Sequence, residues 1–351
     1  MNGEELIETA KTAIGAGEKD DYSLTLATHA ASLEVKVPVL GKILRGSRLK
    51  TSATEFERKD LEAKKAQSVF KKVAGKANWA VFVTSCLSAA LLVVVAFDSK
   101  AQALFVTLGC CGIVAGALGT LWLFEVRQGD LFQTWMNRRA RAEAERLNYF
   151  ELATQAGEDS QGSGMPLSLL QLEYYRRYQL EVQRRYYLQR SQDHKQAADG
   201  MLTLSAYAAG LGALAIGFAG ILGGVLGPKW ACLAGLATVA SALSTFASTK
   251  EALSQDRRNE ELYSKTNDAL AELEGKLDEV RDAAAKGDRE SLKQFVAAVH
   301  EQLSLEHRQW LDAAQNTEAS LANLDKALAQ AKSKPVDANK PENSAEGVTS
   351  R

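Results

Sequence analysis

Residues 201–248 read MLTLSAYAAGLGALAIGFAGILGGVLGPKWACLAGLATVASALSTFAS, and Lys229 is the one charged residue among them. Two uncharged stretches, 201–226 and 230–248, flank the short turn that contains this lysine. A helix needs roughly 20 apolar residues to cross the hydrocarbon core of a bilayer. A turn this short cannot hold a folded domain, so the segment predicts a hairpin of two transmembrane helices.

Another apolar hairpin lies earlier in the chain, before residues 201–248. Residues 79–97 and 103–124 also lack Asp, Glu, Lys and Arg, and residues 98–102 join them. We expect its two spans to cover 79–97 and 103–126. The chain of 351 residues balances 42 Lys+Arg against 43 Asp+Glu, which argues against a large basic surface for nucleic acid. The prediction is an all-α membrane protein with four transmembrane helices in two hairpins, a lipid-bilayer partner and no nucleic-acid partner.

Lysine and arginine near the span ends predict the orientation of the hairpins. The long flanking segments are rich in both, whereas the two short turns hold only Lys100 and Lys229. Because positively charged flanks stay on the cytoplasmic side, both termini and the middle segment are expected there. Trp79, Trp122 and Trp230 lie at or near span ends, where tryptophan anchors helices at the interface.

The rest of the chain divides by composition and by Gly and Pro residues. The predicted parts are a partly disordered N-terminal arm over 1–50, a first unit over 51–156, a linker over 157–166, a second unit over 167–332 and a disordered tail over 333–351. The two units share one layout, which is a polar helix, a hairpin and another polar helix. This shared layout predicts a duplication in which both hairpins have the same orientation in the membrane.

Apolar residues after the fourth span recur in steps of three and four. Tyr263, Leu270, Leu277 and Ala284 belong to the first such seam, and a second seam from Leu292 runs to about residue 332. Gly287-Asp288 separates the two seams and can end one helix and cap the next. Residues 251–332 are thus predicted to form an antiparallel helix pair with coiled-coil character.

The sequence contains no motif that indicates catalysis or metal binding. His300 and His307 are seven residues apart, whereas two metal ligands on one helix usually stand at i and i+4. The four cysteines lie inside the predicted spans and lack the spacing of a zinc site. We expect no enzyme, no cofactor and no metal.

Two sets of small residues in the spans are candidate functional positions. Gly112/Gly116 and Gly220/Gly224 are small-xxx-small pairs that let helix backbones approach, either within one chain or between protomers. Thr238, Ser241, Thr245 and Ser248 form a hydroxyl stripe on the fourth span. These hydroxyls either bond to helix carbonyls and neighbouring helices or line an assembled pore. Both alternatives stay open in each case.

Tyrosine and arginine alternate ahead of the third span, over 174–178 and 184–187. Such runs can stack nucleotides. Membrane-proximal packing and attraction to anionic lipid explain them more simply.

This polar helix, the hairpin that follows it and the ending 301–310 (EQLSLEHRQW) resemble the SLATT family, the SMODS and SLOG-associating two-transmembrane effector domains of bacteria. The first half, with DLEAKKAQSVF at 60–70 ahead of its hairpin, is similar to another variant, so two tandem copies are expected. The resemblance implies an inner-membrane effector that oligomerises and permeabilises the membrane in a nucleotide-triggered antiphage, or abortive-infection, system. A sensor or nucleotide synthase would be its partner. The alternative is a membrane scaffold or a regulated channel that recruits partners through its cytoplasmic helices.

Overall fold

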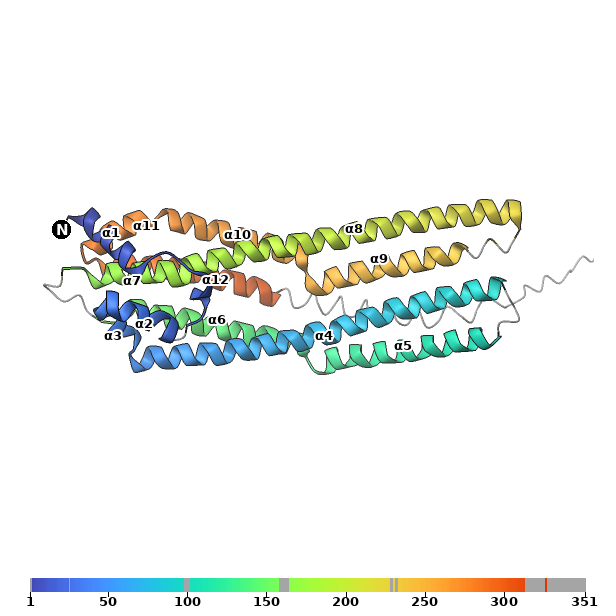
Figure 1. The fold of residues 1–351 in the computed structure, drawn as a ribbon, viewed down its shortest axis with the longest axis horizontal. Coiled ribbons are helices and arrows are strands. Elements are labelled where there is room, and N and C mark those ends of the chain that lie inside the picture. The colour runs from blue at the N-terminus through green and yellow to red at the C-terminus, as the bar shows by residue number, and fades with distance from the viewer. Residues whose placement is uncertain are drawn as a thin grey trace, which may run out of the picture. The chain divides into compact units, whose positions relative to one another are not determined.

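The computed structural model describes residues 2–24, 26–97, 102–157, 164–227, 230, 233–312 and 326. These residues form helices and no strand, which confirms the all-α class (Figure 1). The elements are α1 (Gly3–Ile14), η1 (Lys19–Tyr22), α2 (Leu26–Lys36), α3 (Pro38–Leu44), α4 (Ser47–Phe97), α5 (Gln102–Gln128), α6 (Leu131–Gln155), α7 (Leu167–Tyr175), η2 (Arg176–Leu180), α8 (Glu181–Leu226), α9 (Ala234–Ser254), α10 (Asp256–Gly275), α11 (Leu277–Ala285) and α12 (Arg289–Asp312).

The helices divide into two compact units that do not follow the order of the sequence. One, the polar unit, comprises Met1–Lys72, Gln128–Asp199 and Ser254–Asn316. The other, the apolar unit, comprises Val73–Arg127 and Gly200–Leu253 among the described segments. Each unit therefore takes helices from both predicted halves. The duplication over 51–156 and 167–332 describes the sequence layout, but it does not mark two separate bodies.

The core of the polar unit is aromatic. Tyr149 and Phe150 of α6 are buried against Tyr174 and Tyr175 of α7, and Tyr175 also meets Phe295 of α12 edge-on. Edge-to-face ring pairs add to the stabilisation gained from burying their area. This cluster joins helices that lie far apart in the sequence, so the polar unit is one folded body.

The N-terminal arm is helical over most of its described residues, whereas partial disorder was expected over 1–50. Gly15 caps the end of α1, Pro38 begins α3, and α3 ends at Leu44. The short helices between these breaks nevertheless bury an apolar face in the core, which includes Ala10, Ile14, Leu24, Leu40 and Leu44. Helices this short depend on tertiary packing for their stability. The sequence reveals the breaks but not the partner surface.

The described part of the predicted C-terminal helix pair consists of three helices, α10, α11 and α12, and residues 251–254 belong to α9. Tyr263, Leu270, Leu277 and Ala284 are buried, and Gly287 adopts a φ of +81° between α11 and α12. Asp288 caps α12 by accepting from the backbone N–H groups of the second and third residues after it, at 2.9 and 3.3 Å. The pair also packs on α1, α6 and α7, so it belongs to the core of the polar unit. Its predicted continuation to 332 and the tail over 333–351 lie outside the described residues, apart from residue 326.

The linker over 157–166 is described only at its two ends. Gly157 has a φ of +80°, and α7 starts directly after Pro166. The helical run Leu167–Leu226 is continuous except at η2, a π-helical turn in which the Glu181 N–H donates to the Arg176 carbonyl. A turn of this kind inside an α-helix often marks a functional position.

Candidate functional site

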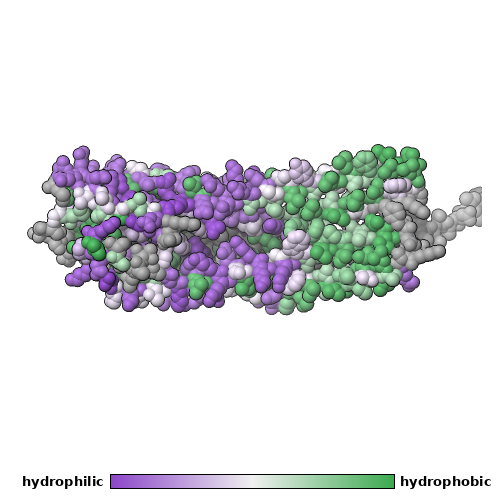
Figure 2. All heavy atoms as spheres, viewed as in Figure 1, coloured by the Kyte–Doolittle hydropathy of each residue, from purple (hydrophilic) through white to green (hydrophobic). Residues whose placement is uncertain are grey.

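Large apolar side chains cover the outside of the apolar unit. Exposed fractions reach 73% at Ile113 on α5 and 64% and 76% at Ile221 and Val225 on α8. Figure 2 shows this concentration of hydrophobic residues over the apolar unit, while hydrophilic residues dominate the polar unit. A water-soluble protein rarely exposes a contiguous apolar area this large. The surface therefore matches a lipid environment.

Two helices of the described chain are long and apolar enough to cross a membrane. They are α5 over Gln102–Gln128 and the helical run Leu167–Leu226. Only 11% and 6% of their most apolar windows are buried, which distinguishes them from core helices of a soluble protein. They contain the second and third predicted spans. The first and fourth, 79–97 and 230–248, include residues or side chains outside the description and are not among these candidates, so the four-span topology stays a prediction.

Small residues form the interior of the apolar unit. A methyl group at Gly212 of α8 would lie 3.2 Å from Cβ of Ala240 on α9. At Gly235 of α9, a methyl group would lie 3.0 Å from Val93 Cγ2 on α4. Such distances are tighter than ordinary van der Waals contact, so these glycines are needed for close helix approach. The second contact also brings the two hairpins together within one unit.

The four glycines selected from the sequence fall into two classes. Gly116 is buried, and the Cα of Gly112 faces Leu87 of α4, whose Cβ would lie 3.9 Å from an added methyl group. Gly220 and Gly224 are exposed, with open space where a methyl group would stand. The first pair therefore lies within the chain's own packing, and the second pair faces outward. Gly212 and Gly235, which make the close approaches between helices described above, were not selected from the sequence.

The outward pair belongs to a longer seam of small residues on α8. All six members are exposed and they alternate in steps of four and three: Ala206, Gly210, Ala213, Gly217, Gly220 and Gly224. At the four glycines, no described atom beyond the neighbouring backbone of α8 itself lies within 4 Å of an added methyl group. We call this stripe the outer seam. Its spacing is that of a helix–helix interface.

Hydroxyl groups in the apolar unit mostly bond within their own helix. Ser85 and Ser88 of α4 donate to carbonyls four residues earlier, at 2.9 Å each. The closest hydroxyl contact between helices joins Ser205 of α8 to Ser244 of α9 at 2.9 Å. The predicted stripe lies beside it, with Thr238 and Thr245 half-buried and Ser241 and Ser248 exposed on α9. Its two interpretations stay open, and the Ser205–Ser244 pair was missed because contact across a hairpin depends on its register.

One polar side chain is fully enclosed at the start of the first predicted span. Asn78 is 3% exposed, and its amide nitrogen donates to the Phe246 carbonyl of α9 at 3.1 Å. The indole of Trp79 lies 4.9 Å from the ring of Phe246, centroid to centroid. Hydrogen bonds between helices are a usual source of specificity in apolar surroundings. This contact therefore fixes how α4 meets α9.

The polar unit contains a buried arginine whose described hydrogen bonds go to uncharged oxygen atoms. Arg146 of α6 is fully buried and donates to the Gln179 side chain at 2.8 Å, to the Tyr22 carbonyl at 2.7 Å and to the Tyr178 carbonyl at 2.9 Å. Its guanidinium also lies 4.6 Å from the ring centre of Tyr22. Carbonyl dipoles and ring faces therefore stabilise its charge.

The tyrosine–arginine run is part of this interior. Tyr174, Tyr175 and Tyr178 are at most 1% exposed, so their ring faces are not available to stack a nucleotide. Glu173, also fully buried, accepts from Arg176 at 2.6 Å and from Arg281 at 2.7 Å. For 174–178 the structure agrees with the packing part of the simpler interpretation, whereas attraction to anionic lipid stays a prediction.

Two histidines of the polar unit are enclosed. His29 Nδ1 lies 2.7 Å from the Tyr174 hydroxyl, which is 2.8 Å from the Tyr149 hydroxyl. Burial, with the positive charge of Arg146 as a second cause, lowers the pKa of His29 to about 4. Burial also lowers the pKa of His300 to about 4. No group of three potential metal ligands is found among the described residues.

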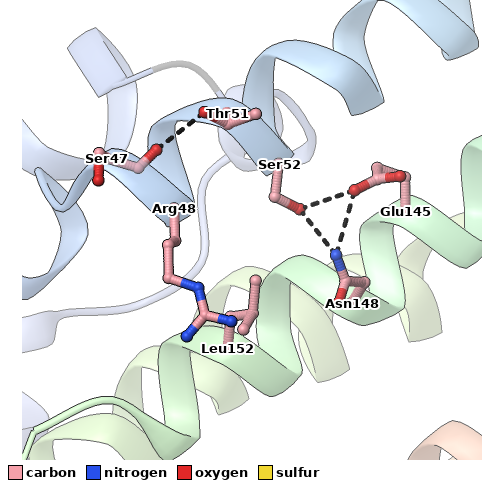
Figure 3. Close-up of a pocket in the computed structure, with 7 residues that line it drawn as sticks. All are labelled: Ser47, Arg48, Thr51, Ser52, Glu145, Asn148 and Leu152. Carbon is pink, nitrogen blue, oxygen red and sulfur yellow. Dashed lines mark hydrogen bonds between the residues drawn. The ribbon is translucent and has the colours of Figure 1, made fainter.

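An open cavity of about 340 Å³ lies beside the start of α4 (Figure 3). Its lining residues are Ser47, Arg48, Thr51, Ser52, Glu145, Asn148 and Leu152. Ser52 donates to Glu145 at 3.1 Å, Asn148 reaches both, and Lys59 pairs with Glu145 at 2.7 Å. These groups satisfy one another, so the cavity does not present a prepared ligand site.

Comparison with known families supports the resemblance for the second half of the chain. Residues 175–310 match the family model SLATT_1, described as SMODS and SLOG-associating 2TM effector domain 1. A second tandem copy over 51–156 stays a prediction. No significant match is found among curated proteins or among solved structures.

Proposed function

We propose, for a chain that carries a SLATT_1 domain over residues 175–310, that it is an effector of the bacterial inner membrane that self-assembles and permeabilises the bilayer. The observation that carries the proposal is the apolar surface of the apolar unit. In particular, α5 and α8 are long enough to span a bilayer and keep their large side chains outside.

Packing within the apolar unit supports a four-span topology. The family description specifies two transmembrane segments, and the matched range contains both 201–226 and 230–248. The first hairpin packs directly against the second through Val93 and Gly235. Helices in such close contact share one environment, and every backbone polar group in lipid must be satisfied within a helix or a closed barrel. We therefore propose that 79–97 and 103–126 cross the membrane too, with both termini cytoplasmic.

The outer seam supports self-assembly. In lipid, helices associate through close backbone packing because the hydrophobic effect no longer favours it. The chain already uses this device inside the apolar unit at Gly212, and the outer seam offers the same chemistry on the surface of α8. A second copy of the chain is the proposed occupant.

The family association motivates the trigger. SLATT_1 is described as SMODS- and SLOG-associating, so a separate sensor or nucleotide synthase is the proposed activating partner in an antiphage system. The proposal involves no catalytic role and no cofactor.

Leakage from vesicles tests the proposal. Purified full-length protein, reconstituted into dye-loaded liposomes, is expected to release dye with a steep dependence on protein concentration. Gly220→Leu/Gly224→Leu should abolish release while the protein still inserts. Gly200→Ala, a change at an open position outside the outer seam, is the matched control. Insertion without leakage at any protein density or in the presence of the partner would contradict permeabilisation.

The size of the folded polar unit favours a second candidate function. Its aromatic core and ion pairs make it a body that can recruit partners, as a membrane scaffold or a regulated channel would. A scaffold gives no conductance in single-channel recordings, and a regulated channel gives reversible, selective conductance. An effector gives large, lasting openings.

A further inference from the structure

The π turn η2 is covered by the segment that follows α1. This segment, Ile14–Leu24, is called the strap here. It lies outside the matched range 175–310, so the family comparison assigns it no role. Its contacts with η2 and the first turn of α8 are polar, whereas α1 and α2 on either side bury apolar residues.

Two arginines of η2 hold the strap. Arg177 donates to both carboxylate oxygens of Asp21, at 2.9 and 3.2 Å, and to the Ile14 carbonyl at 2.6 Å. Arg176 donates to the Gly15 carbonyl at 3.0 Å. Asp21 is only 2% exposed, so this bidentate pair is largely shielded from water.

The first turn of α8 holds the strap from the other side. The Gly17 N–H donates to Glu181 at 3.1 Å, and Arg185 donates to the Gly17 carbonyl at 3.2 Å. A methyl group at Gly17 would lie 2.6 Å from a Glu181 carboxylate oxygen and 3.0 Å from Arg185. Both atoms are the far ends of flexible side chains, so a methyl group here would displace these side chains and the hydrogen bonds that they make with Gly17.

Arg146 of α6 bonds to both the strap and the π turn. It donates to the Tyr22 carbonyl of the strap and to the Tyr178 carbonyl within η2. The π turn thus has partners in the strap and in α6, beside the ion pairs of Arg176 with Glu173 of α7 and Glu181 of α8. A π turn is rare and needs such surroundings to persist.

We propose that the strap is a regulatory element: it holds η2 in its π form, and its release lets the turn close to α-helical hydrogen bonding. A π turn contains about one residue more than an α-helical turn, and each residue of an α-helix turns it by about 100°. Closing η2 while α7 stays in the core therefore rotates α8 by about 100° and moves it about 1.5 Å along its axis.

The rotation changes how α8 meets α9. After an advance of one residue, Leu211 takes the place of Gly212, where even a methyl group would lie 3.2 Å from Ala240. The hairpin cannot keep its resting packing, and Ser205 moves away from Ser244. The strap would thereby control the arrangement of the span that carries the outer seam. A link to leakage rests on the proposed function, whereas the register change does not.

Cysteine cross-linking tests the register change in the full chain. Ser205→Cys/Ser244→Cys, in a chain whose four native cysteines are replaced by alanine, should form an intramolecular disulfide because the two hydroxyls lie 2.9 Å apart. Adding Gly17→Ala should reduce the disulfide yield about tenfold and speed hydrogen exchange in 14–24 about tenfold, the effect of losing one charge-assisted hydrogen bond. Gly3→Ala, at an open position in α1, should change neither.

The outcomes are separable. Faster exchange in the strap with an unchanged disulfide yield would overturn the proposal, because the strap would then be a cover without control over α8. Asp21→Lys, which sets a cation against Arg177, is the second variant. The proposal would also be overturned if residues 14–24 kept their protection from hydrogen exchange in both variants, or if the polar unit unfolded in both. If both variants shift the cross-link yet no leakage follows in liposomes, the proposed function fails and the strap proposal stands.

Discussion

The two units of this protein have opposite interiors and surfaces. The polar unit buries large rings and a complete arginine and exposes charge. The apolar unit buries Ala89, Ala208 and Ala247, each 1% exposed, and turns Ile113, Ile221 and Val225 outward. In water, large apolar side chains are buried because doing so removes area from solvent. In lipid that gain is absent, and small residues allow helices to pack. The chain thus combines a unit whose surface suits water with a unit whose surface suits lipid. Helices α4 and α8 each contribute residues to both units.

The largest expected effect of a single change is at the buried cation of the polar unit. Arg146→Ala should cost about 3–5 kcal/mol of unfolding free energy, since it leaves carbonyls and the Gln179 side chain without their donor. Thermal and denaturant unfolding in detergent would measure it, with the exposed Arg138→Ala on the same helix as control. A loss below about 1 kcal/mol would mean that hydrogen bonding in this interior is not essential.

Leucine at a glycine should separate the two small-residue faces of α8. Gly212→Leu is expected to destabilise the hairpin by about 1–3 kcal/mol because it overpacks the contact with Ala240. Gly220→Leu should leave the unfolding free energy within about 0.5 kcal/mol and weaken self-association instead. Unfolding and analytical ultracentrifugation in detergent measure the two effects. Equal destabilisation by both would remove the distinction between an inner and an outer face.

Acid should loosen the polar unit and leave the apolar unit unchanged. His29 and His300 have pKa values of about 4 when folded, against an ordinary value of 6.5, so the unfolded chain binds more protons between these pH values. Stability contributed by each should be complete above pH 6.5 and fall as the pH drops toward 4, by about 1.4 kcal/mol per pH unit. Hydrogen exchange at a series of pH values, corrected for intrinsic rates, measures it by region.

The control for this prediction is built into the chain, because 73–127 and 200–253 contain no histidine. His29→Gln should remove about half of the acid sensitivity of the polar unit. Equal acid sensitivity in both units would trace the effect to other groups.

The smallest expected effect concerns the serine pair of the apolar unit. A double-mutant cycle on Ser205→Ala and Ser244→Ala should give a coupling of about 0.6 kcal/mol, the usual size of a hydrogen bond between transmembrane helices. Ser85→Ala, whose hydroxyl bonds within its own helix, is the control partner and should show no coupling to Ser244. A coupling near zero would assign the α8–α9 register to packing at Gly212 alone.

Much of the fold could be predicted because its signals are local. Charge-free stretches of spanning length, the seam through Leu270 and Leu277, and the break at Gly287 depend on neighbouring residues in the sequence. The structure confirms the all-α class, the buried seam and the cap at Asp288. The helices of the N-terminal arm, where partial disorder was expected, could not be predicted because their burial depends on distant residues such as Tyr174.

Of the candidate positions, the sequence identified glycine and hydroxyl types but not their partners. Gly112 and Gly220 look alike in sequence, yet one faces Leu87 and the other faces outward. Gly212, Gly235 and the Ser205–Ser244 pair became apparent only once the register of the helices was known. A helix face is periodic and its residue types can be read directly, but which neighbour covers it cannot.

The sequence by itself determined which segments are helical, which suit lipid and which suit water, because hydropathy and helical periodicity are properties of short stretches. The tertiary structure alone decided that helices from both halves combine by polarity, that the N-terminal strap covers η2, and which face of α8 stays open. Those features arise from contacts between residues far apart in the chain, and the free energy of such contacts depends on the packed partners rather than on either segment alone.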